Sequence, residues 1–280
     1  SSSDTDHLTA VGNTLYFRAN DGINGAELWK SDGTASGTVM VKDIYSGSSS
    51  SPLSHLYYLT AIGNTLYFRA SDGTNGYELW KSDGTASGTV MVKDTRSGSG
   101  SSAPAYLTAV GNTLYFRAND GINGIELWKS DGTASGTVMV KDILSGSSGS
   151  SPQYLTVIGN TLYFSATDGT NGHELWKSDG TASGTVMVQD IRSGSSSGNL
   201  YEFTVVGNTL YFRGEDAFHG SELWALDPAN ITGLSGGSGS SGGMTDVTGA
   251  SCSISPSLPT GLSIDSSTSV SYTHLRAHET

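Results

Sequence analysis

The chain is poor in several residue types and patterns that mark common classes of protein. Its 280 residues include a single cysteine, Cys252, so no disulfide bond can form within the chain. Lysine and arginine number 14 against 26 aspartates and glutamates, which gives a formal net charge of −12. This charge argues against a nucleic-acid partner, because phosphate groups attract clusters of basic side chains. No apolar run approaches the roughly 20 residues of a membrane helix and no signal peptide is visible, so no membrane insertion is expected.

The chain has instead a regular repeat. Glu-Leu-Trp occurs five times, and its tryptophans are spaced 51, 48, 48 and 48 residues apart. These tryptophans are Trp29, Trp80, Trp128, Trp176 and Trp224. Such a period favours one large repeat domain. The first copy starts directly after residues 1–4, which we interpret as a sign that the chain is a fragment of a longer protein.

Each copy contains four short β-prone stretches. In the second copy these are residues 58–62, 65–70, 77–81 and 89–94. The Gly-Asn pair between the first two is typical of a two-residue hairpin loop, since both residue types tolerate positive φ angles. Gly, Ser, Thr and Asp interrupt the chain too often for a helix. Four antiparallel strands in about 48 residues is the size of a propeller blade, so the sequence predicts an all-β fold, a β-propeller of about five four-stranded blades.

Analogy with other propellers predicts how the strands are arranged. Leu66 and Phe68 are expected on one face of a blade and Tyr67 on the other, because side chains alternate along a strand. Strand 14–17 and its counterparts are expected nearest the axis, with residues 8–11 closing the ring by adding to the last blade. The Ser- and Gly-rich connectors between copies are expected to be fixed loops, because their length is almost constant.

The fifth copy is incomplete. It keeps Glu-Leu-Trp but lacks the Val-Met-Val strand, so we expect a gap or a substitute near residues 230–234. A run of only Ser and Gly follows. We therefore predict a repeat domain over 1–234, a linker over 235–243, a truncated module over 244–269 and a non-native tail over 270–280, with a disordered or fragmentary C-terminal part.

The repeated glutamates are the first candidates for chemistry. They are Glu27, Glu78, Glu126, Glu174 and Glu222. Paired carboxylates could indicate a glycosidase. Catalysis normally needs one asymmetric constellation, however, so we interpret these recurring residues as structural groups that bind a backbone donor or a neighbouring arginine. The tryptophans likewise favour packing between blades over sugar stacking. No Ser-His-Asp, Cys-His or phosphate-binding motif can be assembled, and we predict a protein that is not an enzyme.

Two aspartate-glycine loops in each copy are further candidates. Asp32-Gly33-Thr34 and its counterparts have the form of an Asx turn, in which the carboxylate accepts backbone N–H groups. The other loop places oxygen ligands in a glycine-rich segment, which makes its aspartates weak calcium candidates although the EF-hand pattern is absent. These aspartates are Asp21, Asp72, Asp120 and Asp168. A structural turn is favoured in both loops; no cofactor is predicted, and calcium stays open.

The motif Glu-Leu-Trp-Lys-Ser-Asp-Gly-Thr stands complete in the first four copies, beginning at positions 27, 78, 126 and 174. Residues 8–226 thereby resemble the bacterial ELWxxDGT repeat family, which implies propeller-like repeats in large secreted or surface-attached proteins. Residues 253–265 are similar to the opening of an Ig-like, cadherin-like module of bacterial surface proteins. The resemblance implies an extracellular or cell-surface location and a non-enzymatic interaction or adhesion module. The propeller domain of a carbohydrate-active enzyme and a purely structural spacer stay open as alternatives.

Positions that vary between constant neighbours are the candidate ligand contacts. One position reads Ala26, Tyr77, Ile125, His173 and Ser221, and a nearby loop position reads Ile23, Thr74, Ile122, Thr170 and Phe218. Rigid amphipathic rings dominate recognition surfaces, so we predict ligand contact at Tyr77, His173, Phe218 and His219. Freedom from constraint is the alternative explanation. The expected partner is a protein or a glycan, and the chain is expected to be a monomer.

Overall fold

The computed structural model describes the chain except for residues 1–2, 4, 47–55, 219, 231–243 and 247–280. The described residues form five four-stranded antiparallel sheets and one short 3-10 helix, which confirms the all-β repeat fold. Within that part of the chain, no helix has the length and apolar character that crossing a membrane requires.

Each sheet contains four strands that follow one another along the chain. The first contains β1 (Asp6–Val11), β2 (Thr14–Asn20), β3 (Ala26–Ser31) and β4 (Val39–Lys42). The second contains β5 (Leu56–Ile62), β6 (Thr65–Ser71), β7 (Tyr77–Ser82) and β8 (Val90–Lys93). The third contains β9 (Ala105–Val110), β10 (Thr113–Asn119), β11 (Ile125–Ser130) and β12 (Val138–Lys141). The fourth contains β13 (Gln153–Ile158), β14 (Thr161–Thr167), β15 (His173–Ser178) and β16 (Val186–Gln189). The fifth contains β17 (Tyr201–Val206), β18 (Thr209–Asp216), β19 (Gly220–Leu226) and β20 (Met244–Asp246), with η1 (Pro228–Asn230) after β19.

The Gly-Asn pairs form the predicted two-residue hairpin loops. In the first sheet Val11 pairs with Thr14, which leaves Gly12 and Asn13 as the loop. Gly12 and its counterparts have φ of 56–62°, whereas the asparagines are not among the residues with positive φ. A positive φ at only the first loop residue is the requirement of a type II′ turn, so the glycine is the residue that the turn needs.

The sheets stack face to face through two distinct faces. We call Leu66, Phe68, Ala70 and Trp80 with their counterparts the Trp face, and Tyr67, Leu79 and Val92 with their counterparts the Tyr face. In each of the four core clusters, the Tyr face of one sheet packs against the Trp face of the next. This confirms the predicted alternation of side chains along the strands and the predicted packing role of the tryptophans in the second to fifth sheets.

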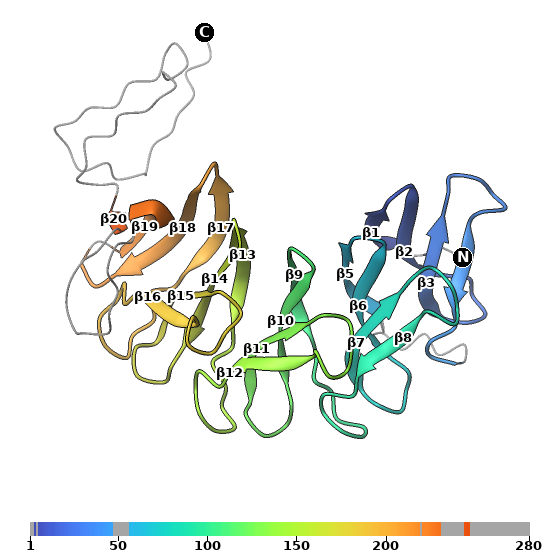
Figure 1. Ribbon diagram of the computed structural model, residues 1–280, viewed down its shortest axis with the longest axis horizontal. Coiled ribbons are helices and arrows are strands. Elements are labelled where there is room, and N and C mark those ends of the chain that lie inside the picture. Colours follow the sequence, from blue (N-terminus) through green and yellow to red (C-terminus); the bar gives the residue numbers. More distant parts are fainter. Residues whose placement is uncertain (1–2, 4, 47–55, 219, 231–243, 247–280) are drawn as a thin grey trace, which may run out of the picture.

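The five sheets follow an arc, with the first and fifth sheets at its two ends (Figure 1). The first strands of neighbouring sheets contact one another, as in β1 with β5, β5 with β9, β9 with β13 and β13 with β17. The prediction that residues 14–17 and their counterparts lie innermost is therefore wrong, because β1 and its counterparts hold that place. The prediction that residues 8–11 add to the last blade is also wrong, since β1 pairs with β2 of its own sheet.

Lysines connect the first four sheets across their junctions. Lys30 Nζ donates to the carbonyl of Gly84 in the next sheet at 2.8 Å, and Lys42 Nζ donates to the carbonyl of Thr89 at 2.7 Å. The same pairs recur between the second and third and between the third and fourth sheets. Lys42 also lies 5.8 Å from the ring centroid of Trp80, within the range of a cation–π contact.

The fifth sheet obtains its fourth strand from a later part of the chain than predicted. β20 pairs with β19 through Met244 opposite Leu226 and Asp246 opposite Trp224. The expected substitute near residues 230–234 is not the strand found, since Asn230 ends the 3-10 helix and residues 231–234 lie outside the described residues. Residues 244–246, assigned from the sequence to a truncated module, thus belong to the fifth sheet.

Candidate functional site

The repeated glutamates of the first four sheets are buried structural clamps. Glu126 is fully buried and accepts hydrogen bonds from the backbone N–H groups of Ile143 (3.2 Å), Leu144 (3.1 Å) and Ser150 (2.8 Å), and from the hydroxyl of Ser150 (2.5 Å). Ser150 lies in the connector to the next sheet. The clamp therefore fixes that connector, which confirms the predicted backbone donor and the predicted fixed loop.

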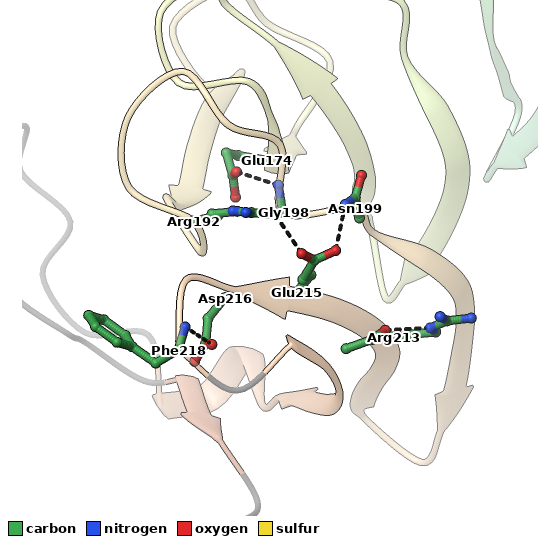
Figure 2. A network of polar contacts seen from close by, with 9 residues as sticks. Glu174, Arg192, Gly198, Asn199, Arg213, Glu215, Asp216 and Phe218 are labelled. Carbon is green, nitrogen blue, oxygen red and sulfur yellow. Dashed lines mark hydrogen bonds and ion pairs between the residues drawn. The ribbon is translucent and has the colours of Figure 1, made fainter.

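The other clamps follow the same plan with local differences. Glu78 binds Thr95 and Ser102, and Glu174 binds Ile191 and Gly198. Glu27 binds Ile44 and Tyr45, and its connector over 47–55 lies outside the described residues. Figure 2 shows the bond from the Gly198 N–H to Glu174. No arginine side chain is a partner in the described contacts of these four glutamates, so the predicted pairing with the arginines of the hairpin strand finds no support.

Burial shifts the acidity of all four clamp glutamates in one direction. It raises the pKa of Glu27 to about 7 and that of Glu174 to about 8, against the donated backbone hydrogen bonds that lower both values. Burial also raises the pKa of Glu78 and of Glu126. A raised carboxyl pKa often marks a catalytic acid. Here its cause is the packing of the connector, and the same group recurs in each of four sheets.

The aspartates that are weak calcium candidates accept hydrogen bonds from N–H groups of their own loop. Asp21 Oδ1 accepts hydrogen bonds from the backbone of Ile23 (2.8 Å) and Asn24 (2.7 Å), and Oδ2 accepts one from the Asn24 amide at 2.7 Å. The backbone hydrogen bond of Asn24 is the largest cause that lowers the pKa of Asp21. Asp72, Asp120 and Asp168 repeat the arrangement. A carboxylate that accepts hydrogen bonds from these N–H groups stabilises the turn. Among the described residues, no three or more His, Cys, Asp or Glu side chains form a group that could hold a metal ion.

The second loop is the predicted Asx turn. Asp32 Oδ1 accepts hydrogen bonds from the backbone N–H of Thr34 at 2.9 Å and from its hydroxyl at 2.7 Å. Gly33 has φ of 90°, the left-handed region that favours glycine. The turn recurs at Asp83, Asp131 and Asp179.

The residues predicted to contact a ligand lie on three different sheets. Tyr77 and His173 begin β7 and β15, with their backbone N–H groups bound to Ser101 and Ser197 of the connectors. Arg69 lies 4.6 Å from the Tyr77 ring centroid, and burial lowers the pKa of His173. Phe218 is 90% exposed beyond β18, and His219 lies outside the described residues. The structure brings these residues together in neither of the two cavities described below, and ligand contact there stays a prediction.

A different surface, on the inner side of the arc, gathers aromatic side chains from several sheets. Each first strand contains a register shift, and at that shift one residue other than glycine has a positive φ. These residues are His7, Tyr58, Tyr106, Tyr154 and Glu202, with φ of 53–57°. Left-handed backbone costs a residue with a side chain roughly 1 kcal/mol or more. The bulge itself belongs to the scaffold because it recurs, whereas the side chain on it varies between sheets.

We call the surface made by residues 58–60, 106–108 and 154–156 with Glu202 and Phe203 the inner wall. It encloses a cavity of about 470 Å³. Tyr154 is its centre, with its ring centroid 6.2 Å from that of Tyr106 and 5.8 Å from that of Phe203. Tyr58 is 41% exposed. The wall therefore offers partly exposed aromatic rings beside leucines and threonines, in a concave shape typical of ligand sites.

A polar network joins the fourth and fifth sheets (Figure 2). Arg192 Nη1 lies 2.6 Å from Glu215 Oε1, and the Asn199 amide donates to Glu215 Oε2 at 2.7 Å. Glu215 N–H also donates to the carbonyl of Gly198 at 2.6 Å. The backbone bond recurs at other junctions, as from Thr167 N–H to the carbonyl of Ser150. The position of Glu215 is Asn, Ser, Asn or Thr in the other copies, so its side-chain contacts are specific to this junction.

Sequence reasoning missed both the inner wall and this network. The position occupied by His7, Tyr58, Tyr106, Tyr154 and Glu202 varies between copies, but the residue before it varies as well, so it does not stand out between constant neighbours as Tyr77 and His173 do. It was overlooked because the neighbouring strand was expected to lie innermost. The ion pair between Arg192 and Glu215 joins two sheets, and no spacing in the sequence indicates that pairing.

Comparisons with known proteins support the fold and go no further. No family model matches the chain, and no curated protein matches it. One similar solved structure is a mutant of a puromycin hydrolase complexed with PGG, with 12% identity and a TM-score of 0.52, covering 80% of this chain and 36% of that one. Another is prolyl oligopeptidase B from Galerina marginata bound to a 35mer hydrolysis and macrocyclization substrate, with 11% identity, a TM-score of 0.50 and coverage of 81% and 36%.

These likenesses define the class of fold. The chain is an all-β repeat protein of the β-propeller type, since the matching parts of both neighbours are their propeller domains. It spans about a third of the length of those neighbours. At such low identity the peptidase activity of the neighbours is a property of those proteins alone.

Proposed function

We propose that the chain is a non-enzymatic interaction or adhesion module of a secreted or cell-surface bacterial protein, and that it binds a glycan or protein ligand through the inner wall. The five sheets are then five blades of a propeller, the last completed by β20. The extracellular location follows from the resemblance of the repeats to the ELWxxDGT family and not from the fold.

The observation that carries this proposal is the inner wall. Its three tyrosines lie on strained backbone, where a glycine would be more stable, and they lie next to one another in a concave surface. The rings pack in part against neighbours, as Tyr154 does against Phe203 and Tyr106 against Arg117, but they stay partly exposed in the cavity, where a ligand could contact them. Tyrosine supplies a large, rigid contact area with a polar tip, which is why it is enriched at recognition surfaces.

The position of the recurring carboxylates favours the hypothesis of a binding module over that of a carbohydrate-active enzyme. A glycosidase needs one acid and one base or nucleophile that reach the substrate. Glu27, Glu78, Glu126 and Glu174 are at most 2% exposed and already accept backbone hydrogen bonds. They are therefore structural acceptors, and the resemblance to a paired-carboxylate site ends there.

The test replaces Tyr58, Tyr106 and Tyr154 together by glycine. Glycine accepts the left-handed φ, so the variant keeps its fold while it loses the rings. Binding is measured on a glycan array and on immobilised matrix proteins, and folding by circular dichroism. We expect the glycine variant to lose at least about tenfold in affinity for whichever ligand the unmodified protein captures.

A second variant distinguishes the inner wall from the contacts predicted on the sequence. It carries Tyr77→Ala, His173→Ala and Phe218→Ala, and by this proposal it binds like the unmodified protein. Loss of binding in this variant, with unchanged binding in the glycine variant, would move the site to those residues. Capture on the glycan array alone or on protein surfaces alone decides the ligand class.

A further inference from the structure

The two ends of the arc are the two halves of one interface. Inside the arc, a Tyr face covers a Trp face at four junctions. At one end the Trp face of the first sheet has no partner sheet among the described residues, and at the other end the same is true of the Tyr face of the fifth sheet (Figure 1). The chain therefore carries one unused copy of each complementary face.

Exposure shows how incomplete the Trp face of the first sheet is. Leu15 is 37% exposed, whereas its counterparts in the other four sheets are at most 1% exposed. Those counterparts are Leu66, Leu114, Leu162 and Leu210. Trp29 is only half-buried, although the other four tryptophans are buried. A cavity of about 500 Å³ lies over this face, lined by Leu15, Phe17, Ala19 and Trp29 among others.

The Tyr face of the fifth sheet has the matching deficit. Leu223 is 39% exposed, whereas Leu28, Leu79, Leu127 and Leu175 are fully buried. Tyr211 is half-buried, and the four tyrosines at its position in the other sheets are buried. Exposed apolar patches on folded proteins commonly mark interaction sites.

We propose that these end faces bind each other between two copies of this chain, with the fifth sheet of one copy stacked on the first sheet of its neighbour. A second copy of this chain fits the end faces, because every copy carries both halves of an interface that already forms four times within the chain. The monomer expected from the sequence is the competing state. The contact is heterologous, so an open assembly keeps one free Tyr face at one end and one free Trp face at the other.

We expect the contact between two copies to be weaker than an internal junction, because it lacks polar contacts that the internal junctions have. At internal junctions a lysine such as Lys30 donates to the turn of the next sheet, but the fifth sheet has Ala225 at that position. The turn at Gly33 would therefore receive no lysine from Ala225. The apolar contacts stay available, and we expect association that depends on protein concentration.

Two end variants test the proposal by complementation. Leu15→Glu puts a charge on the Trp face of the first sheet, and Leu223→Glu puts one on the Tyr face of the fifth. Both positions are partly exposed, so the fold tolerates the change, and circular dichroism checks this. The matched control is Ile122→Glu, at a residue that is 74% exposed in a loop of the third sheet, on neither end face.

Mass is measured by light scattering during gel filtration over a wide range of concentration. The unmodified chain and Ile122→Glu are expected to associate, and each end variant alone is expected to stay monomeric. An equimolar mixture of the two end variants should form a one-to-one dimer, because one supplies an intact Tyr face and the other an intact Trp face.

Two outcomes would overturn the proposal. The first is an unmodified chain that stays monomeric at every concentration. This result would overturn the proposal whatever its cause, even if residues outside the described part cover the end faces. The second is association that persists in each end variant alone, which would place the contact elsewhere on the surface.

Discussion

The three junctions among the first four sheets differ from the junction between the fourth and fifth sheets in the polar groups that cross them. In the first three, two lysines donate to two carbonyls of the next sheet, as Lys129 does to Gly180 at 2.9 Å and Lys141 to Thr185 at 2.8 Å. At the fourth junction Gln189 replaces the second lysine, and Pro228 follows Ala225-Leu226-Asp227 where the acceptor turn would be.

One donor and the acceptor turn have thus been lost at the fourth junction. The first lysine is kept as Lys177, which is half-buried. The pair of Arg192 with Glu215 and the bond from Asn199 join the two sheets there instead. The apolar faces are kept at all four junctions. Stacking therefore depends on the apolar faces, whereas the polar contacts across a junction can differ from one junction to the next.

The largest effect that separates regular sheets from the fifth should come from the clamp glutamate. Glu126→Ala leaves the N–H groups of Ile143, Leu144 and Ser150 without their acceptor, and each unsatisfied buried donor costs about 1–3 kcal/mol. We expect a loss of at least about 3 kcal/mol in the free energy of unfolding, measured by denaturant titration.

The matched control is Glu222→Ala at the same position of the fifth sheet. Glu222 is half-buried and receives no hydrogen bond among the described residues. Its removal should change the free energy of unfolding by about 0.5 kcal/mol or less. Equal losses at both positions would show that the clamp has no special role in the regular sheets.

The second effect is a dependence of stability on pH. The folded chain raises the pKa of Glu27 to about 7 and that of Glu174 to about 8, from an ordinary value of 4.5, because both are buried. The folded state therefore binds these protons more tightly than the unfolded state. The resulting stabilisation is complete below the unfolded pKa and is lost as pH rises through 7 and 8.

The melting temperature, followed by circular dichroism, should accordingly fall as the pH rises from about 5, below both raised pKa values, to about 9, above both. Glu174→Gln removes one of the groups with a raised pKa and should make this fall smaller. A melting temperature that rises over this range would contradict the assignment of the raised pKa values to the clamps.

The strands and their two faces could be predicted from the sequence. Features that depend on contacts between sheets could not. Alternation around Leu66 and Tyr67 and the glycine of the hairpin loop are local signals, so they could be read directly. The order of strands from inside to outside could not, because both β1 and β2 are apolar and only contacts between sheets separate them. The inner wall was missed for the same reason. The strand at 244–246 was missed because it follows a run of only Ser and Gly and has no counterpart of the Val-Met-Val sequence.

The third effect concerns glycines that lie against the neighbouring sheet. Gly132 has φ of 88°, and a methyl group added there would lie 2.4 Å from the Tyr67 hydroxyl. Gly33 has almost the same φ of 90°, but nothing lies within 4 Å of that point, since no described sheet packs against this side of the first sheet. Both alanine variants bear the backbone strain of roughly 1 kcal/mol, and only Gly132→Ala adds the clash.

Gly132→Ala should therefore lose about 1–2 kcal/mol more than Gly33→Ala in the free energy of unfolding. Chemical denaturation of the two variants side by side measures the difference. If a second copy covers the first sheet, as proposed above, the penalty at Gly33 should grow with protein concentration. Equal penalties at every concentration would mean that Tyr67 moves aside at little cost.

The smallest effect should come from the ion pair that is specific to the fourth junction. Arg192 and Glu215 are about a third exposed, so solvent screens their attraction and a pair of this kind contributes about 0.5–1 kcal/mol. A double-mutant cycle with Arg192→Gln and Glu215→Gln isolates that coupling from the bond to Asn199, which both forms of residue 215 can accept through an oxygen. The coupling should fade as salt is added, because mobile ions screen partly exposed charges. A coupling of zero at low salt would mean that the apolar faces hold the fifth sheet without a contribution from this ion pair.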